Sequence, residues 1–233
     1  MTAATNLVLV PGLLCTKALW APQMAALGDI ADMTVADHTR HDTMEGIAKS
    51  ILAAAPARFA LAGLSMGGYI AYEILRQAPE RVTKLALLDT GYRADAPERR
   101  EQRLALMALA EREGARQAQE TLLPALIHKS RLTDKALVEA VLKMGADTGT
   151  EAFKRQQTAL ISRPDSSPLL ANIRCPTLVV VGREDALTLP QLSEEIAAGI
   201  PGAKLEIIPD CGHLSTMERP AAVNRALRAW LTA

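Results

Sequence analysis

The feature that most constrains the fold of this chain is a Gly-x-Ser-x-Gly motif spanning residues 63–67. The residues before it, 59–62, are apolar, and those after it are spaced like one face of a helix. This order predicts a nucleophile elbow, a sharp turn between a strand and a helix that exposes one serine at its apex. Glycines at 63 and 67 suit such a turn, because a side chain two positions from the serine would collide with the backbone. We therefore predict that Ser65 is a nucleophile.

Length, composition and charge indicate one α/β domain with a modest insertion. The chain has 233 residues, of which 49% are hydrophobic, enough for a large core. Its 26 basic and 26 acidic residues give a formal net charge of zero, and no basic stripe is present. We therefore expect neither nucleic acid nor an anionic membrane as a partner. The stretch 99–103, in which three arginines are interleaved with Glu101 and Gln102, is interpreted as a solvated helix face.

The N-terminus and the cysteines predict a cytoplasmic protein. Met1–Asn6 lacks a charged region, and Pro11 and Gly12 interrupt the apolar run behind it, so we expect no signal peptide and no membrane span. The cysteines are few, odd in number and unclustered, which fits reduced thiols. We expect Cys15 and Cys211 to be small buried residues, with sensitivity to thiol reagents as the alternative.

Short apolar runs alternate with helical patterns along the chain. The apolar runs show no polar alternation, which is typical of strands covered on both faces in a parallel sheet; they span 7–10, 33–36, 59–62, 85–88, 177–181 and 205–208. Helices are expected at about 17–27, 43–55, 66–78, 189–199 and 219–232. This alternation predicts an α/β fold in which an open, mostly parallel sheet of about six strands is flanked by helices.

The segment 93–165 differs from the rest of the chain. It contains no convincing strand, and its Leu, Met, Val and Ala positions predict three or four amphipathic helices. We expect residues 1–92 and 166–233 to form the α/β core and residues 93–165 to form a helical lid over the carboxyl ends of the strands. A purely structural role is the alternative. The near absence of aromatic residues predicts a pocket for an aliphatic or small acyl group.

A serine hydroxyl is a weak nucleophile, so it needs a base and the base needs an orienting acid. His213 follows the run 205–208 and Asp185 follows the run 177–181, so both lie where open sheets place their sites. We expect His213 to be the general base and Asp185 the acid. Asp89, which follows the run 85–88, is the reserve candidate for the acid.

The oxyanion that forms during attack needs backbone donors near the serine. The N–H of Met66, directly after the nucleophile, and the N–H of Leu13, in the turn after the first strand, are the expected pair.

The remaining histidines, His38, His41 and His128, are expected to have structural roles, although the loop with His38 and His41 could lie near the rim of the pocket. No metal-binding or nucleotide-binding spacing is present, so no metal and no cofactor are expected.

The chain resembles the α/β-hydrolase superfamily over nearly its whole length. The resemblance rests on Gly-Leu-Ser-Met-Gly-Gly at 63–68, Gly-Arg-Glu-Asp at 182–185, Cys-Gly-His at 211–213 and a closing helix with Trp230. It is similar to small bacterial, cofactor-independent members of the enol-lactonase and carboxylesterase types.

Three departures from the superfamily pattern stand out. Pro11-Gly12 stands where many relatives have His-Gly, and Asp37–His41 replaces the usual Asp-x-Arg-Gly-x-Gly loop. The chain is also expected to begin at the strand before the oxyanion turn, without the usual N-terminal hairpin.

The resemblance implies a serine hydrolase that cleaves a small carboxylic ester, thioester or lactone through a Ser-His-Asp triad and an acyl-enzyme. One alternative is a non-hydrolytic use of the same residues, as a C–C lyase, acyltransferase or perhydrolase. The other is a ligand-binding receptor or scaffold that retains the triad. The expected partner is a small ester-type molecule, and the sequence does not predict an oligomeric state.

Overall fold

The centre of the structure is a six-stranded sheet in which every neighbouring pair of strands is parallel. The computed structural model describes residues 4–233. The strands are β1 (Thr5–Val10), β2 (Ala31–Val35), β3 (Phe59–Leu64), β4 (Val82–Leu88), β5 (Thr177–Gly182) and β6 (Lys204–Ile208). Their order across the sheet is β2-β1-β3-β4-β5-β6. The predicted fold class is therefore confirmed, and all six strands lie within a few residues of the predicted runs.

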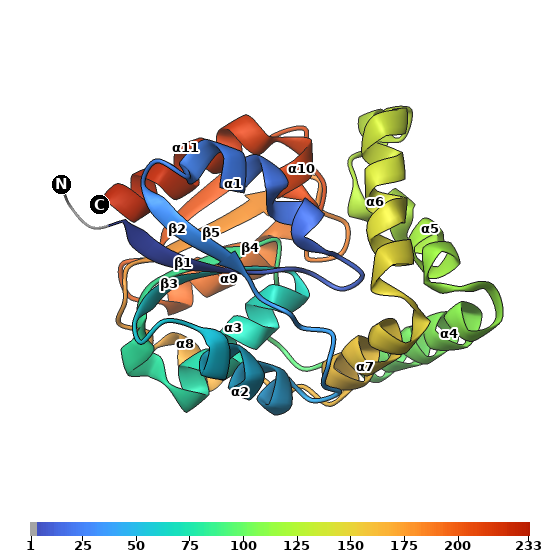
Figure 1. Cartoon of the computed structure of the whole chain (residues 1–233), viewed down its shortest axis with the longest axis horizontal. Helices are drawn as coiled ribbons and strands as arrows, with labels where there is room; N and C mark the ends of the chain where they lie inside the picture. The colour runs from blue at the N-terminus through green and yellow to red at the C-terminus, as the bar shows by residue number, and fades with distance from the viewer. Residues whose placement is uncertain (1–3) are drawn as a thin grey trace.

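Helices cover both faces of the sheet (Figure 1). On one face lie α1 (Ala21–Leu27), α10 (Ser215–Glu218) and α11 (Pro220–Thr232); on the other lie α2 (Met44–Ala54), α3 (Met66–Gln77), α8 (Ser167–Leu170) and α9 (Pro190–Gly199). Alternate strand residues supply the two cores. Leu7 and Leu9 pack in the cluster with α1 and α11, whereas Val8 and Val10 pack in the cluster with α2, α3 and α9. The short helices η1 (Lys17–Trp20) and η2 (Pro79–Arg81) precede α1 and β4.

The two edge strands are less buried than the sequence predicts. In β2, Asp32 and Thr34 are exposed, and in β6, Lys204 and Glu206 are exposed, so each edge strand alternates. The four inner strands are buried on both faces over most of their length. The prediction of complete burial was wrong at the edges because an edge strand has a neighbour on one side only.

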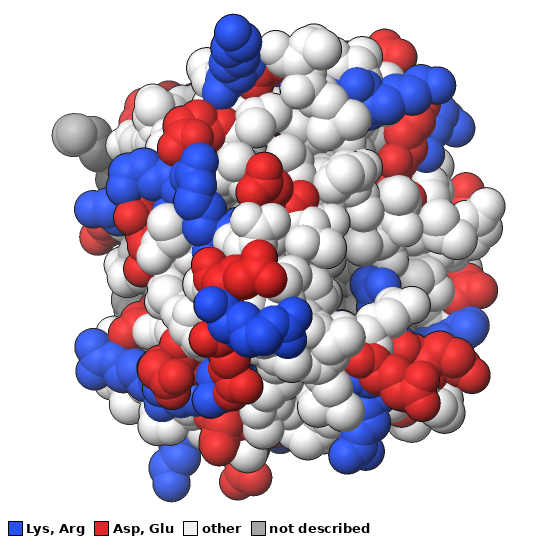
Figure 2. All heavy atoms as spheres, turned by 90° about the vertical axis from the view of Figure 1, so that its right-hand side faces the viewer, with Lys and Arg blue, Asp and Glu red and all other residues white. Residues whose placement is uncertain are grey.

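Four helices between β4 and β5 form a separate layer. They are α4 (Pro97–Glu113), α5 (Ala115–Leu126), α6 (Lys135–Thr148) and α7 (Thr150–Ile161), with η3 (Lys129–Arg131) between α5 and α6. Gly114 and Gly149 join consecutive helices at φ values of 91° and 76°, which glycine adopts without strain. Figure 1 shows this layer beyond the carboxyl ends of the strands. Over the face it presents, basic and acidic side chains are intermixed (Figure 2).

Within residues 4–233, no helix has both the length and the apolar composition required to cross a bilayer. The absence of a signal peptide was expected from Met1–Asn6. The first three of these residues, Met1–Ala3, lie outside the described residues.

The junction between α2 and β3 is held by one arginine. The half-buried Arg81 guanidinium donates hydrogen bonds to four backbone carbonyls: Leu52 O at 2.8 Å, Ala55 O at 3.0 Å, Pro56 O at 2.7 Å and Ala57 O at 3.1 Å. Carbonyls at the end of a helix have no partner within the helix. The planar guanidinium satisfies those of this junction together, so it fixes the approach to the strand that carries the Gly-x-Ser-x-Gly motif.

We therefore expect Arg81→Lys to lower the free energy of unfolding by about 2 kcal/mol, because an ammonium group cannot reach four carbonyls in this plane. Urea denaturation followed by circular dichroism measures the change. Arg58→Lys is the matched control, since Arg58 is exposed and its side chain forms no hydrogen bond within residues 4–233. Equal stability of the two variants would contradict this role for Arg81.

Candidate active site

Ser65 sits in a sharp turn between β3 and α3. Its backbone has φ 54° and ψ −115°, a conformation that is strained for a residue with a side chain. The flanking glycines allow the turn to pack. A Cβ at Gly63 would overlap the carbonyl of Gly67, and a Cβ at Gly67 would overlap the carbonyl of Val10. The predicted strand–turn–helix context is present, and it exposes the Ser65 hydroxyl at the end of the sheet.

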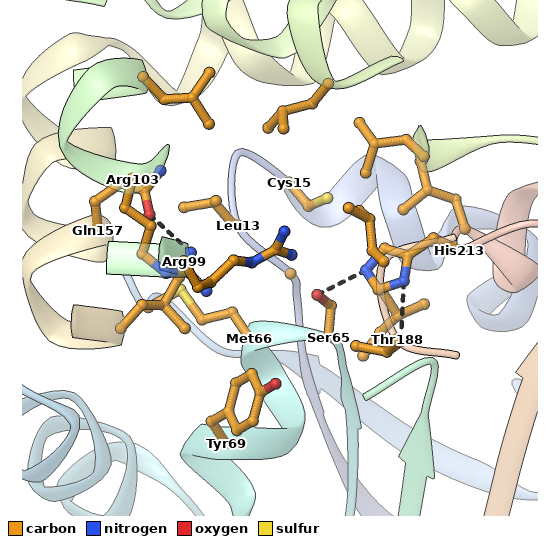
Figure 3. Close-up of a pocket in the computed structure, with 18 of the residues that line it drawn as sticks. Leu13, Cys15, Ser65, Met66, Tyr69, Arg99, Arg103, Gln157, Thr188 and His213 are labelled. Atoms are coloured by element: carbon orange, nitrogen blue, oxygen red, sulfur yellow. Dashed lines mark hydrogen bonds between the residues drawn. The ribbon is translucent and has the colours of Figure 1, made fainter. Parts of the chain in front are cut away.

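Ser65, His213 and Asp185 form one line of hydrogen bonds, although they come from three separate loops. His213 Nε2 lies 2.8 Å from Ser65 Oγ, and His213 Nδ1 lies 2.8 Å from Asp185 Oδ2. Figure 3 shows the His213 ring beside Ser65 at the edge of the cavity. The loops after β3, β5 and β6 thus bring together the three residues selected from the sequence.

The Asp185 carboxylate is held by a short turn that the sequence analysis did not single out. Its Oδ1 accepts hydrogen bonds from the N–H groups of Leu187 at 2.8 Å and Thr188 at 2.9 Å, and its Oδ2 accepts one from the Thr188 hydroxyl at 2.7 Å. The signal for this turn was an Asp followed three residues later by Thr, a spacing that favours such local bonds.

Burial and charge act in opposite directions on the two buried groups. Burial alone raises the pKa of Asp185, but the adjacent His213 charge and the hydrogen bonds outweigh it, so the pKa lies below its ordinary value. Burial alone lowers the pKa of His213, but the Asp185 charge and hydrogen bond outweigh it, so the pKa lies above 6.5. Each group therefore favours the charged form of the other.

Asp89, the reserve candidate for the acid, contacts other partners. Its Oδ1 accepts a hydrogen bond from the Gly182 N–H at 3.0 Å, and its Oδ2 accepts from the Ser215 N–H at 3.2 Å and the Ser215 hydroxyl at 2.5 Å. Burial, followed by the negative charge of Asp185, raises the pKa of Asp89 to about 8. Burial and the Asp185 charge thus disfavour ionisation of Asp89, whereas the contact with His213 favours the negative charge on Asp185.

The two expected oxyanion donors face the same cavity as Ser65. Leu13 and Met66 both line it, and neither backbone N–H donates a hydrogen bond within residues 4–233. Met66 is the first residue of α3, where the N–H groups have no partner inside the helix.

His38 lies beneath the turn that contains Leu13. It is buried, and its Nε2 is 2.9 Å from Gly12 O and 3.0 Å from Gln156 Nε2; Gln156 Oε1 in turn accepts the Leu14 N–H at 3.2 Å. Burial lowers the pKa of His38, so the ring is neutral at neutral pH. His38 therefore has a structural role, as expected: together with Gln156 of α7 it supports the turn after β1.

A cavity of about 110 Å³ lies between the helical layer and the Ser65 turn. Leucine is the most frequent residue in its wall, which also contains Arg99, Gln102 and Arg103 of α4. The interpretation of the stretch 99–103 as a solvated face was therefore wrong for Arg103, which is buried, and for the half-buried Arg99; the other three residues are exposed. Residues 99, 102, 103 and 106 have the i, i+3, i+4, i+7 spacing of one helix face, and this spacing was the signal for a shared direction.

The cysteines near the site are held in their thiol form. Burial raises the pKa of Cys15, which lines the cavity, to about 12, and burial together with nearby carboxylates also raises the pKa of Cys211. Because the thiolate is the reactive form, the expected role as buried residues is favoured over reactivity toward thiol reagents.

No set of three His, Cys, Asp or Glu residues within 4–233 is arranged to hold a metal ion. His41 and His128 do not line the cavity.

Comparisons with known proteins identify the family of this chain. A model of the alpha/beta hydrolase family matches residues 7–226. The chain is 30% identical over 217 residues to 2-hydroxy-6-oxononadienedioate/2-hydroxy-6-oxononatrienedioate hydrolase of Escherichia coli, covering 86% of this chain and 72% of the relative. The chain belongs to the alpha/beta hydrolase family.

Two solved structures are similar over almost the whole chain. A thermophilic esterase from Thermogutta terrifontis, solved with malate bound, is 31% identical at a TM-score of 0.91, with coverage of 99% of this chain and 90% of that chain. The enol-lactonase from Burkholderia xenovorans is 24% identical at a TM-score of 0.89, with coverage of 99% and 92%. The resemblance to the α/β-hydrolase superfamily inferred from the sequence is confirmed. The similarity to the enol-lactonase, at 24% identity, shows the fold alone.

The opposed effects of burial and charge can be measured directly at His213. We expect ¹⁵N NMR titration to give His213 a pKa above 6.5, and Asp185→Asn to lower it, because the variant keeps the burial and removes the negative charge. Asp89→Asn is the matched control and should shift the pKa less, since the Asp89 carboxyl bonds to Gly182 and Ser215 and forms no hydrogen bond to His213 within residues 4–233. A His213 pKa that does not respond to Asp185→Asn would contradict the pairing.

Proposed function

We propose that this chain is a serine hydrolase that cleaves a small carboxylic ester, thioester or lactone through an acyl-enzyme. The observation that carries this proposal is the hydrogen-bond line from Ser65 through His213 to Asp185 at the wall of a cavity. The 31% identity to a thermophilic esterase supports the choice of ester-type substrates.

In the proposed reaction, Ser65 Oγ attacks the substrate carbonyl while His213 Nε2 takes its proton. Asp185 orients the ring and stabilises the imidazolium. The backbone N–H groups of Leu13 and Met66 donate hydrogen bonds to the oxyanion of the tetrahedral intermediate. His213 then gives the proton to the leaving group, and later removes one from the water that hydrolyses the acyl-enzyme.

The helices of residues 93–165 serve in this proposal as a lid. Their residues Arg99, Leu106 and Leu122 form part of the cavity wall opposite the Ser65 turn. A lid in this position excludes water from the acyl-enzyme and selects the group that enters.

Reaction with a fluorophosphonate probe tests the nucleophile. We expect rapid covalent labelling of the wild-type protein at Ser65, identified by mass spectrometry, and none in Ser65→Ala. Ser215→Ala is the matched control because Ser215 is buried and bonded to Asp89. An unlabelled but folded wild-type protein would favour the alternative of a ligand-binding receptor or scaffold.

The acid is tested by comparing two conservative variants. Asp185→Asn should lower kcat for a p-nitrophenyl ester by about 10⁴-fold, since the amide no longer selects the His213 tautomer with a free Nε2. Asp89→Asn should change kcat much less, because Asp89 bonds to Gly182 and Ser215 while Asp185 bonds to the His213 ring. The assignment of the acid fails if Asp89→Asn abolishes turnover and Asp185→Asn does not.

A further inference from the structure

The wall of the cavity carries positive charge without negative charge. Arg99 and Arg103 line it, and no Asp or Glu of the described residues does. The charge of Arg103 is compensated outside the cavity, because its Nε lies 2.5 Å from Asp95 Oδ2. Asp95 also accepts from Arg163, whose Nη2 lies 2.7 Å from Oδ1. Both oxygens of this buried carboxylate are therefore already in use.

Arg99 has no such compensation. Its one hydrogen bond to a side chain within residues 4–233 is from Nη1 to Gln102 Oε1, one turn along α4, at 3.3 Å, and it forms no ion pair there. The neighbouring acids on α4, Glu98 and Glu101, are exposed on other faces of the helix. Figure 3 shows the Arg99 guanidinium extending into the cavity toward Ser65.

The charge of Arg99 is close enough to act on the serine site. It is among the groups that influence His213, where it opposes protonation and so lowers the pKa, although less than Asp185 raises it. A cation this near the reacting groups, in a wall that is largely apolar, interacts more strongly with an anion than it would in water.

Gln157 holds Arg103 in the wall of the cavity. It is fully buried on α7, and its Oε1 accepts a hydrogen bond from Arg103 Nη1 at 2.9 Å. Its Nε2, by contrast, has no hydrogen-bond partner within residues 4–233. Because this atom is also shielded from solvent, it is not available to a ligand, and Arg99 remains the charged donor in the wall that lacks a compensating acid within the described residues.

We propose that the substrate carries a carboxylate, which the guanidinium of Arg99 binds in the cavity in front of Ser65. This inference rests on the proposed hydrolase function. It narrows the substrate class to esters, thioesters or lactones that are anionic at neutral pH. Arg99 is then the residue that determines specificity for the anion.

Three p-nitrophenyl esters of matched length test the proposal: the monoester of adipic acid, the ester of adipamic acid and the ester of ε-aminocaproic acid. They end in a carboxylate, a neutral amide and an ammonium group. We expect the wild-type protein to prefer the carboxylate ester in kcat/KM, after subtraction of uncatalysed hydrolysis. Arg99→Gln should reduce the ratio of kcat/KM for carboxylate over amide by about 10- to 100-fold.

Further variants separate charge from shape. Arg99→Lys should restore part of the preference, and Arg99→Glu should reverse it in favour of the ammonium ester. Arg100→Gln is the matched control, because Arg100 is an exposed arginine on the same helix that does not line the cavity. A carboxylate-to-amide ratio near one in the wild-type protein, or the same ratio in Arg99→Gln as in wild type, would overturn the proposal.

A binding measurement keeps the two proposals distinguishable. Monomethyl adipate is titrated calorimetrically into Ser65→Ala and into the double variant with Arg99→Gln, neither of which can form an acyl-enzyme. We expect about 10-fold weaker binding or more in the double variant. Binding that depends on Arg99 without turnover of any ester would retain the anion site and reject the hydrolase function. Turnover of the esters without dependence on Arg99 would retain the hydrolase function and reject the anion site.

Discussion

The close contact between backbone segments at the Ser65 turn is the constraint on which the rest of the site depends. Gly67 lies against the carbonyl of Val10, and Gly63 lies against the carbonyl of Gly67, so the first turn of α3 meets the end of β1 without a side chain between them. This contact holds Ser65 at a positive φ and brings the Leu13 and Met66 amides to the same cavity. The positions of the serine and of its expected donors are thus set by the packing of one helix onto two strands.

Electrostatic balance determines which of the two buried acids acts on the histidine. Asp89 and Asp185 are near enough for the charge of one to raise the pKa of the other, and ionising both would be unfavourable. The amide bonds from Leu187 and Thr188 and the contact with His213 favour the charge on Asp185. The Asp89 carboxyl instead bonds to Gly182 at the end of β5 and to Ser215 at the start of α10, and so links these two segments.

The sheet and the three hydrogen-bonded residues were readable from the sequence because each depends on local pattern and chain order. Inner strands are continuous apolar runs, and residues that follow parallel strands meet at one edge of the sheet. Contacts between the α/β core and the helical insertion were not readable in this way. Neither the link from His38 to Gln156 nor the entry of Arg99 into the cavity follows from any spacing within one segment. The periodicity of α4 indicates that residues 99, 102, 103 and 106 share a face. Because three of them are charged or polar, the sequence favoured a solvent-facing position over the cavity wall that they form.

The bond from the Leu14 amide to Gln156 has a consequence for how such a protein can diversify. Gln156 belongs to the same helical insertion that forms the cavity wall, yet it fixes the turn that presents the Leu13 amide. Replacement of the insertion by that of a relative would therefore alter the position of the Leu13 amide as well as the shape of the cavity. An exchanged insertion would therefore need its own side chain to bond the Leu14 amide in place of Gln156.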